Sequence, residues 1–152
     1  MPYKTIIAAA LIAFFILPSK AEHKEYALKE EAVLMATKAA EFLTEDEDRA
    51  LAAFQNRNSS FFFHDLYVFV IDDKGVFVAH GDKPHLIGKS GYNMKDTRNF
   101  AFVQAFLSIK NRGWVTYKWP DSRDDGMIKE KKSYIIRVKD KIVGVGYFKD
   151  PR

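Results

Sequence analysis

The chain has 152 residues, of which 47% are apolar, 14% aromatic and 29% charged, a composition typical of a globular protein. This length accommodates one domain whose core is large enough to be stable. Cysteine is absent, which excludes disulfides, thiolate metal sites and cysteine nucleophiles. The formal net charge is only +4 and the basic residues are spread along the chain, so nucleic acid is not an expected partner.

Residues 1–21 have the pattern of a secretory signal peptide. A positive start is followed by an apolar run over residues 6–17 and then by a small-x-small cleavage site that ends at Ala21. The run is short for a membrane span, which needs about 20 apolar residues. We therefore expect cleavage after Ala21, with an uncleaved anchor as the alternative. The mature protein is then one domain, residues 22–152, that is periplasmic or secreted.

Three helices are predicted from the spacing of apolar residues. A long amphipathic helix covers Glu25–Glu45, because apolar side chains recur there at helical spacing. Thr44 begins a Thr-x-x-Glu capping box, which predicts that a shorter second helix starts there and ends near Asn56. The third helix covers Thr97–Lys110.

From Phe61 onward the apolar pattern has the period of two that is typical of strands. The predicted strands are Leu66–Ile71, Val76–His80, Trp114–Trp119, Lys132–Val138 and Ile142–Phe148. Short hairpin turns join the first pair and the last pair, and hairpin connections require antiparallel neighbours. The predicted fold class is α+β: one antiparallel sheet of about five strands, with the long N-terminal helix and the other helices packed on it.

Residues that could perform catalysis or bind a metal are sparse. No two histidines have the helical i, i+4 spacing of a zinc site, and the one weak loop candidate combines His80 and His85 with Asp82. No serine lies in a Gly-x-Ser-x-Gly elbow. We expect no catalytic residue, no metal site and no cofactor. An enzyme that uses His80 with Asp72 or Asp82 is the weakest function hypothesis.

Aromatic residues alternate along two of the predicted strands. Tyr67 and Phe69 share one face of the first strand, and Tyr117 and Trp119 share one face of the third. Rings with a polar tip are common in the walls of small-molecule pockets. The same pattern also suits an ordinary core beneath the helices, and periodicity alone favours that interpretation.

Several short segments occur in an order and spacing that match a known family. They are Asp65–Asp72, Ala79-His80, Leu86–Lys89, Gly113–Trp119, Lys132-x-Tyr134 and Val143–Tyr147. Together they resemble the single-Cache sensor domain over about residues 28–148. This family consists of extracytoplasmic ligand sensors of bacterial chemoreceptors and histidine kinases, with a long N-terminal helix and a PAS-like antiparallel sheet.

The resemblance implies a pocket for a small organic carboxylate or a related metabolite. The residues that would line it are Tyr67, Phe69, His80, Lys89, Arg98, Tyr117, Trp119, Lys132 and Tyr134. Lys89, Arg98 and Lys132 would supply positive charge, with a solvated surface position as the equal alternative for each. Gly81 replaces a proline common in the family, and residues 121–126 also differ from it, so the resemblance leaves the ligand's identity open.

The leading hypothesis is an exported, non-enzymatic ligand-binding protein. Because the chain ends at Arg152 without a transducer, we expect it to relay a signal to a membrane sensor kinase or chemoreceptor. The alternative is an accessory protein with a vestigial pocket, which docks on a membrane sensor or forms a homodimer through Glu25–Glu45. Ala32, Ala36 and Ala39 form a small-residue seam on that helix, which permits close helix approach but equally suits packing on the protein's own sheet.

Overall fold

The computed structural model describes residues 25–149, so the predicted signal peptide lies outside the described residues. The elements are α1 (Lys29–Glu45), α2 (Glu47–Gln55), β1 (Phe62–Phe63), β2 (Leu66–Asp72), β3 (Phe77–His80), the 3-10 turn η1 (Pro84–Leu86), α3 (Phe102–Ser108), β4 (Arg112–Asp121), β5 (Met127–Val138) and β6 (Lys141–Phe148). Within residues 25–149, no helix is long and apolar enough to cross a membrane.

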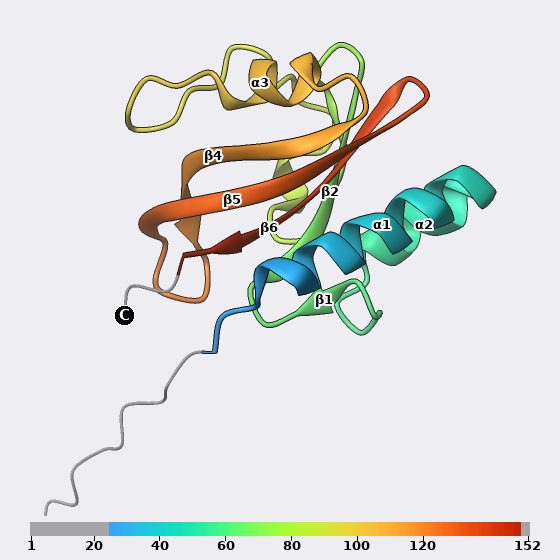
Figure 1. Ribbon diagram of the computed structural model, residues 1–152, viewed down its shortest axis with the longest axis horizontal. Helices are drawn as coiled ribbons and strands as arrows, with labels where there is room; N and C mark the ends of the chain where they lie inside the picture. The colour runs from blue at the N-terminus through green and yellow to red at the C-terminus, as the bar shows by residue number, and fades with distance from the viewer. Residues whose placement is uncertain (1–24, 150–152) are drawn as a thin grey trace, which may run out of the picture.

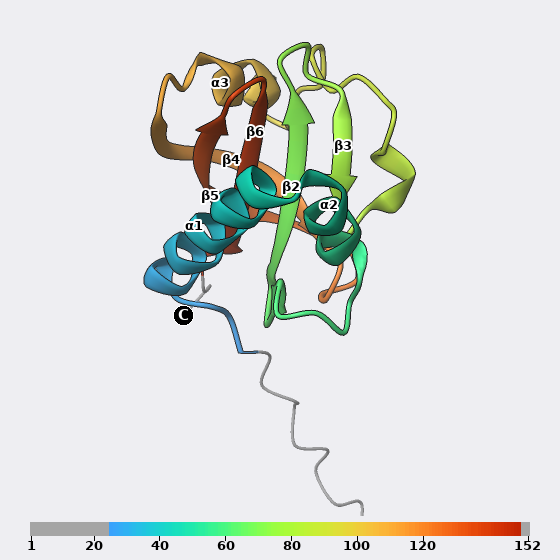
Figure 2. The ribbon, with the colours of Figure 1, turned by 90° about the vertical axis from the view of Figure 1, so that its right-hand side faces the viewer.

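The six strands form one antiparallel sheet in the order β1-β2-β6-β5-β4, and β3 also pairs with β2. Helices α1 and α2 cover one face of this sheet, and α3 lies over the opposite face (Figure 1). Figure 2 shows β3, β2 and β6 side by side, with α1 and α2 in front of them. The predicted α+β class is therefore confirmed, with a short sixth strand, β1, that periodicity did not reveal.

Helix starts differ from the prediction because local hydrogen bonds fix them. The carboxylate of Glu31 accepts the backbone N–H of Leu28 at 2.7 Å, so α1 begins four residues later than expected. The prediction that Thr44 caps the second helix is wrong: its hydroxyl donates to the carbonyl of Ala40 at 2.8 Å. Asp46 is the cap instead, since its side chain accepts the N–H of Arg49 at 3.1 Å.

The third helix is shorter than predicted, beginning at Phe102 rather than Thr97. The carboxylate of Asp96 accepts the backbone N–H groups of Arg98 and Phe100, which holds this stretch as a turn. Asn99 lies in the left-handed region with a φ of 62°, a conformation that ends helical continuity.

The helix-covered face of the sheet forms one half of the core. Leu66, Val68 and Val70 of β2 point toward α1 and α2. The small residues Ala32, Ala36 and Ala39 of α1 are completely buried in this same cluster, so α1 lies close to the strands. These alanines pack on the protein's own sheet, and the proposed small-residue seam is therefore not free for a second copy.

On the other face, two glycines of β6 leave room for large side chains from neighbouring strands. The ring of Phe69 lies directly over Gly144, where an added Cβ would overlap the ring. At Gly146 an added Cβ would lie 2.6 Å from Cε of Lys131, whose side chain crosses this point of the sheet. The absence of a side chain in β6 thus positions both Phe69 and Lys131.

Gly144→Ala is expected to destabilise the protein by about 1–3 kcal/mol, because the ring of Phe69 has to move from a fully packed position. Urea unfolding followed by circular dichroism measures this change. The matched control is Gly113→Ala, where the nearest contact is the flexible Cδ1 of Ile109 at 3.1 Å. Equal stability of the two variants would contradict the packing described for β6.

Candidate ligand-binding site

Buried aromatic rings form a continuous wall on the face of the sheet beneath α3. Tyr67 and Phe69 come from β2 and Tyr117 and Trp119 from β4, and all four are buried. The ring of Phe102, from α3, stacks on Tyr117 with 4.9 Å between centroids. Strand alternation places these rings on one face, as predicted, and α3 separates them from solvent.

His80 ends β3 in the middle of this wall. Its ring centroid lies 5.1 Å from that of Tyr67 and 6.0 Å from that of Trp119. The imidazole Nδ1 accepts the backbone N–H of Lys83 at 3.0 Å. Burial lowers the pKa of His80 to about 3, so the ring is uncharged at neutral pH. With Nδ1 accepting, the proton of the neutral ring is on Nε2, which makes His80 a hydrogen-bond donor.

A buried lysine is the central feature of this face. Lys131 lies on β5 directly opposite Tyr117 of β4, and its side chain is fully buried. The Nζ atom is 3.8 Å from the ring centroid of Tyr67 and 4.9 Å from that of Phe148. It has no hydrogen-bond partner among the described residues. Burial lowers the pKa of Lys131 to about 7, opposed by the charge of Asp65.

Trp119 and Tyr117 add polar atoms to the aromatic wall. The indole N–H of Trp119 is near enough to the Tyr67 hydroxyl to oppose the rise in pKa that burial causes there. The indole N–H nevertheless has no acceptor within hydrogen-bond geometry among residues 25–149. The Tyr117 hydroxyl is 3.0 Å from Oγ of Ser133. Two buried donors, an amine and an indole N–H, thus lack acceptors on this face, and both are suited to an anion.

The rim of the site is polar. Asp82 accepts a hydrogen bond from Ser122 at 2.7 Å and lies 3.2 Å from Nζ of Lys83. Lys83 also extends over Trp119, with 5.9 Å between Nζ and the ring centroid. A cavity of ≈50 Å³ lies next to this rim, and its lining includes Tyr67 and Phe148. This volume holds on the order of two water molecules.

Four of the nine residues predicted for the site lie elsewhere. Lys132 and Tyr134 point to the opposite, helix-covered face, where Tyr134 packs against Trp114 at 4.9 Å between centroids. Lys89 is exposed in the loop after η1. Arg98 is exposed as well and pairs with Asp96 at 3.3 Å. The structure therefore brings together the other five, which are Tyr67, Phe69, His80, Tyr117 and Trp119.

The sequence analysis predicted Lys132 as a site residue, but the lysine on the aromatic face is its neighbour Lys131. Both faces of the sheet are covered, so Ile135 and Ile136 are both buried and apolar periodicity does not show which face is which. The signal that identifies Lys131 is hairpin register. Tyr117 pairs with Lys131, and directly opposed residues of an antiparallel pair have side chains on the same face.

Three larger hollows within residues 25–149 have no buried unpaired donor in their lining. A groove of ≈370 Å³ between α1 and β1 has a mostly apolar lining that includes Leu34 and Phe63, both exposed. Within residues 25–149, no three histidine, aspartate or glutamate side chains gather as a metal site would require. The Lys131 face is therefore the candidate site.

Several solved structures with a similar fold are sensor domains or chemotaxis proteins. A methyl-accepting chemotaxis protein of Vibrio parahaemolyticus is 21% identical, with a TM-score of 0.66 over 78% of this chain and 84% of that one. A periplasmic sensor domain of a chemotaxis protein has a TM-score of 0.62 at 21% identity, covering 80% and 90% of the two chains. A third structure is a Cache chemosensory domain, solved to explain its carboxylic acid recognition. It has a TM-score of 0.62 at 21% identity, covering 80% of this chain and 88% of that one.

A search of the curated proteins finds no match to this chain. The family model of the Cache domain, in contrast, matches residues 27–149, which includes every helix and strand described above. The helices and the antiparallel sheet agree with that match. The chain belongs to the Cache domain family of sensor domains.

Proposed function

We propose that this Cache domain is an exported, non-enzymatic sensor that binds a small organic carboxylate through Lys131 and relays its occupancy to a membrane sensor kinase or chemoreceptor. The observation that carries the proposal is the fully buried amine of Lys131, which has no hydrogen-bond partner among the described residues. An unpaired buried cation costs several kcal/mol, and a bound anion removes most of that cost.

The surroundings of Lys131 suit one carboxylate with a short apolar chain. The amine and the indole N–H of Trp119 are free to donate, and each charge-assisted hydrogen bond contributes about 1.5–3 kcal/mol. Phe69 and the ring of Tyr67 provide the apolar wall, and the small adjacent cavity limits chain length. The similar fold of a Cache domain that recognises carboxylic acids supports this ligand class.

A thermal-shift screen tests the proposal. The purified protein is heated with acetate, propionate, lactate, pyruvate or malate, and with acetamide as an uncharged control of the same size. An acid present at 100 times its dissociation constant should add about 2.7 kcal/mol to the free energy of unfolding, which raises the melting temperature by several degrees. The proposal fails if none of the acids raises the melting temperature, or if acetamide raises it equally.

A further inference from the structure

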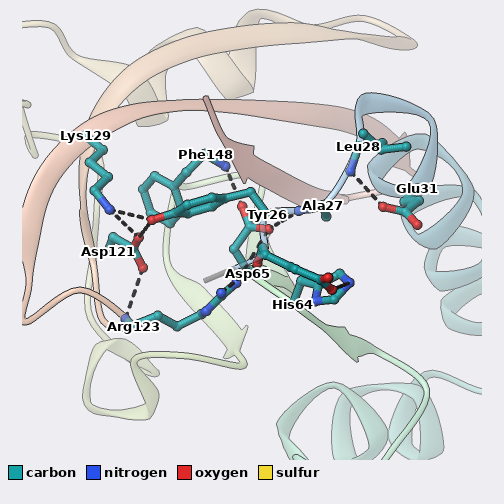
Figure 3. Close-up of polar contacts among 11 residues, drawn as sticks. Tyr26, Ala27, Leu28, Glu31, His64, Asp65, Asp121, Arg123, Lys129 and Phe148 are labelled. Atoms are coloured by element: carbon teal, nitrogen blue, oxygen red, sulfur yellow. Dashed lines mark hydrogen bonds and ion pairs between the residues drawn. The ribbon is translucent and has the colours of Figure 1, made fainter. Parts of the chain in front are cut away.

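A single buried carboxylate holds both ends of the domain. Asp65, immediately before β2, accepts the backbone N–H of Ala27 at 2.6 Å through Oδ1. Its other oxygen, Oδ2, accepts the backbone N–H of Phe148 at 2.6 Å. Ala27 precedes α1 and Phe148 is the last residue of β6, so Asp65 joins the segment that enters the domain to the strand that leaves it (Figure 3). We name these two hydrogen bonds the terminal bridge.

Further contacts attach the entering segment to the far end of β4. The hydroxyl of Tyr26 donates to Asp121 at 3.0 Å, and the guanidinium of Arg123 donates to the carbonyl of Glu25 at 2.6 Å. Figure 3 shows these side chains around the terminal bridge. Another nitrogen of Arg123 lies 3.9 Å from Asp65, which places a cation beside this carboxylate.

Lys131 is a further cation whose charge acts on Asp65, and it connects the terminal bridge to the candidate site. Its amine lies 4.9 Å from the ring of Phe148, the residue whose backbone N–H Asp65 accepts. Burial raises the pKa of Asp65, and the two backbone hydrogen bonds and the charge of Lys131 oppose that rise. The charge of Lys131 therefore contributes, together with these hydrogen bonds, to keeping Asp65 a carboxylate, which is the stronger acceptor.

We propose that the terminal bridge is the output of the sensor: an anion bound at Lys131 weakens the hold of Asp65 on Ala27 and Phe148 and releases the two terminal segments. This inference rests on the proposed function, because it takes Lys131 as the ligand's partner. The bound anion offsets the charge of Lys131, so Asp65 binds a proton more readily. A protonated carboxyl is a weaker acceptor than a carboxylate, and both hydrogen bonds weaken together.

Amide hydrogen exchange measured by NMR on the purified protein tests this output. In the presence of whichever acid of the screen binds, exchange at Ala27 and Phe148 is expected to accelerate at least threefold, while amides in the middle of β2 slow down. Asp65→Asn should remove the acceleration. The matched control is Asp96→Asn, another buried carboxylate that accepts backbone N–H groups, including that of Lys118, and it should keep the acceleration.

A measurement without ligand distinguishes this inference from the proposed function. Lys131→Met removes the cation in the absence of any acid, and it should accelerate exchange at Ala27 and Phe148 to the same extent. If Lys131→Met does not fold, Lys131→Gln is measured instead. Acceleration in the variant, with no acid binding to the wild type, supports the terminal bridge and contradicts the proposed function. The terminal bridge is overturned if exchange at both amides is unchanged in the variant, or if a bound acid slows them with the rest of the sheet.

Discussion

Lys131→Met is expected to weaken carboxylate binding about 10- to 100-fold while leaving the protein at least as stable as the wild type. The loss follows from removing a charge-assisted hydrogen bond, for which about 1.5–3 kcal/mol is typical. The gain in stability follows because Lys131 is fully buried without a hydrogen-bond partner, and methionine is an unbranched apolar side chain of similar length. An ordinary structural lysine would show the opposite change in stability.

Isothermal titration calorimetry measures the affinity, and urea unfolding measures the stability of the variant. Lys132→Met is the matched control, because this neighbouring lysine lies on the helix-covered face of the same strand and should keep wild-type affinity. Unchanged affinity in Lys131→Met, or an equal loss in both variants, would show that the ligand does not contact Lys131.

The pH dependence of stability provides the second large effect. The pKa of Lys131 is lowered from its ordinary 10.5 to about 7 in the folded protein. Between these values the unfolded chain binds more protons than the folded one, so this group makes stability rise as pH rises from about 7 to 10.5. The shift corresponds to about 5 kcal/mol at most, at roughly 1.4 kcal/mol per pKa unit. In Lys131→Met, the free energy of unfolding should no longer show this rise with pH.

Ligand affinity should change with pH in the opposite direction. A carboxylate prefers the protonated amine, so binding raises the pKa of Lys131 and takes up a proton above pH 7. Affinity should then fall up to about tenfold for each pH unit between 7 and 9. His80 does not contribute in this range, because burial lowers its pKa to about 3. Calorimetric titrations at several pH values measure this dependence, and an affinity independent of pH would contradict it.

The order and type of the elements were predictable from the sequence because apolar residues recur at helical spacing in the helices and with a period of two in the strands. The hairpin at Asp72–Gly75 was predicted from its turn residues, and Gly75 has the positive φ of 83° that the turn requires. Helix ends were less predictable, because they depend on side-chain acceptors such as Asp46 and Asp96. These compete with equally plausible capping residues nearby, including Thr44.

The residues of the candidate site were predictable only in part from the sequence. Tyr67 and Trp119 were predicted from the resemblance to the Cache family, and the period of two along β2 and β4 placed each of them on one face of its strand. Lys131 was not, because lysines occupy both faces of β5 and the register of a ten-pair ladder decides between them. Asp65 was part of the matched sequence but gave no sign of its role, which depends on contacts with Ala27 and Phe148, 38 and 83 residues away.

The most direct test of the central claim is a crystal structure of the protein with the acid that gives the largest thermal shift. We expect a carboxylate oxygen about 2.7–2.9 Å from Nζ of Lys131, with the apolar end of the acid against the aromatic wall of Tyr67 and Phe69. An acid bound in the groove between α1 and β1, or bound on the sheet without contact to Lys131, would contradict it.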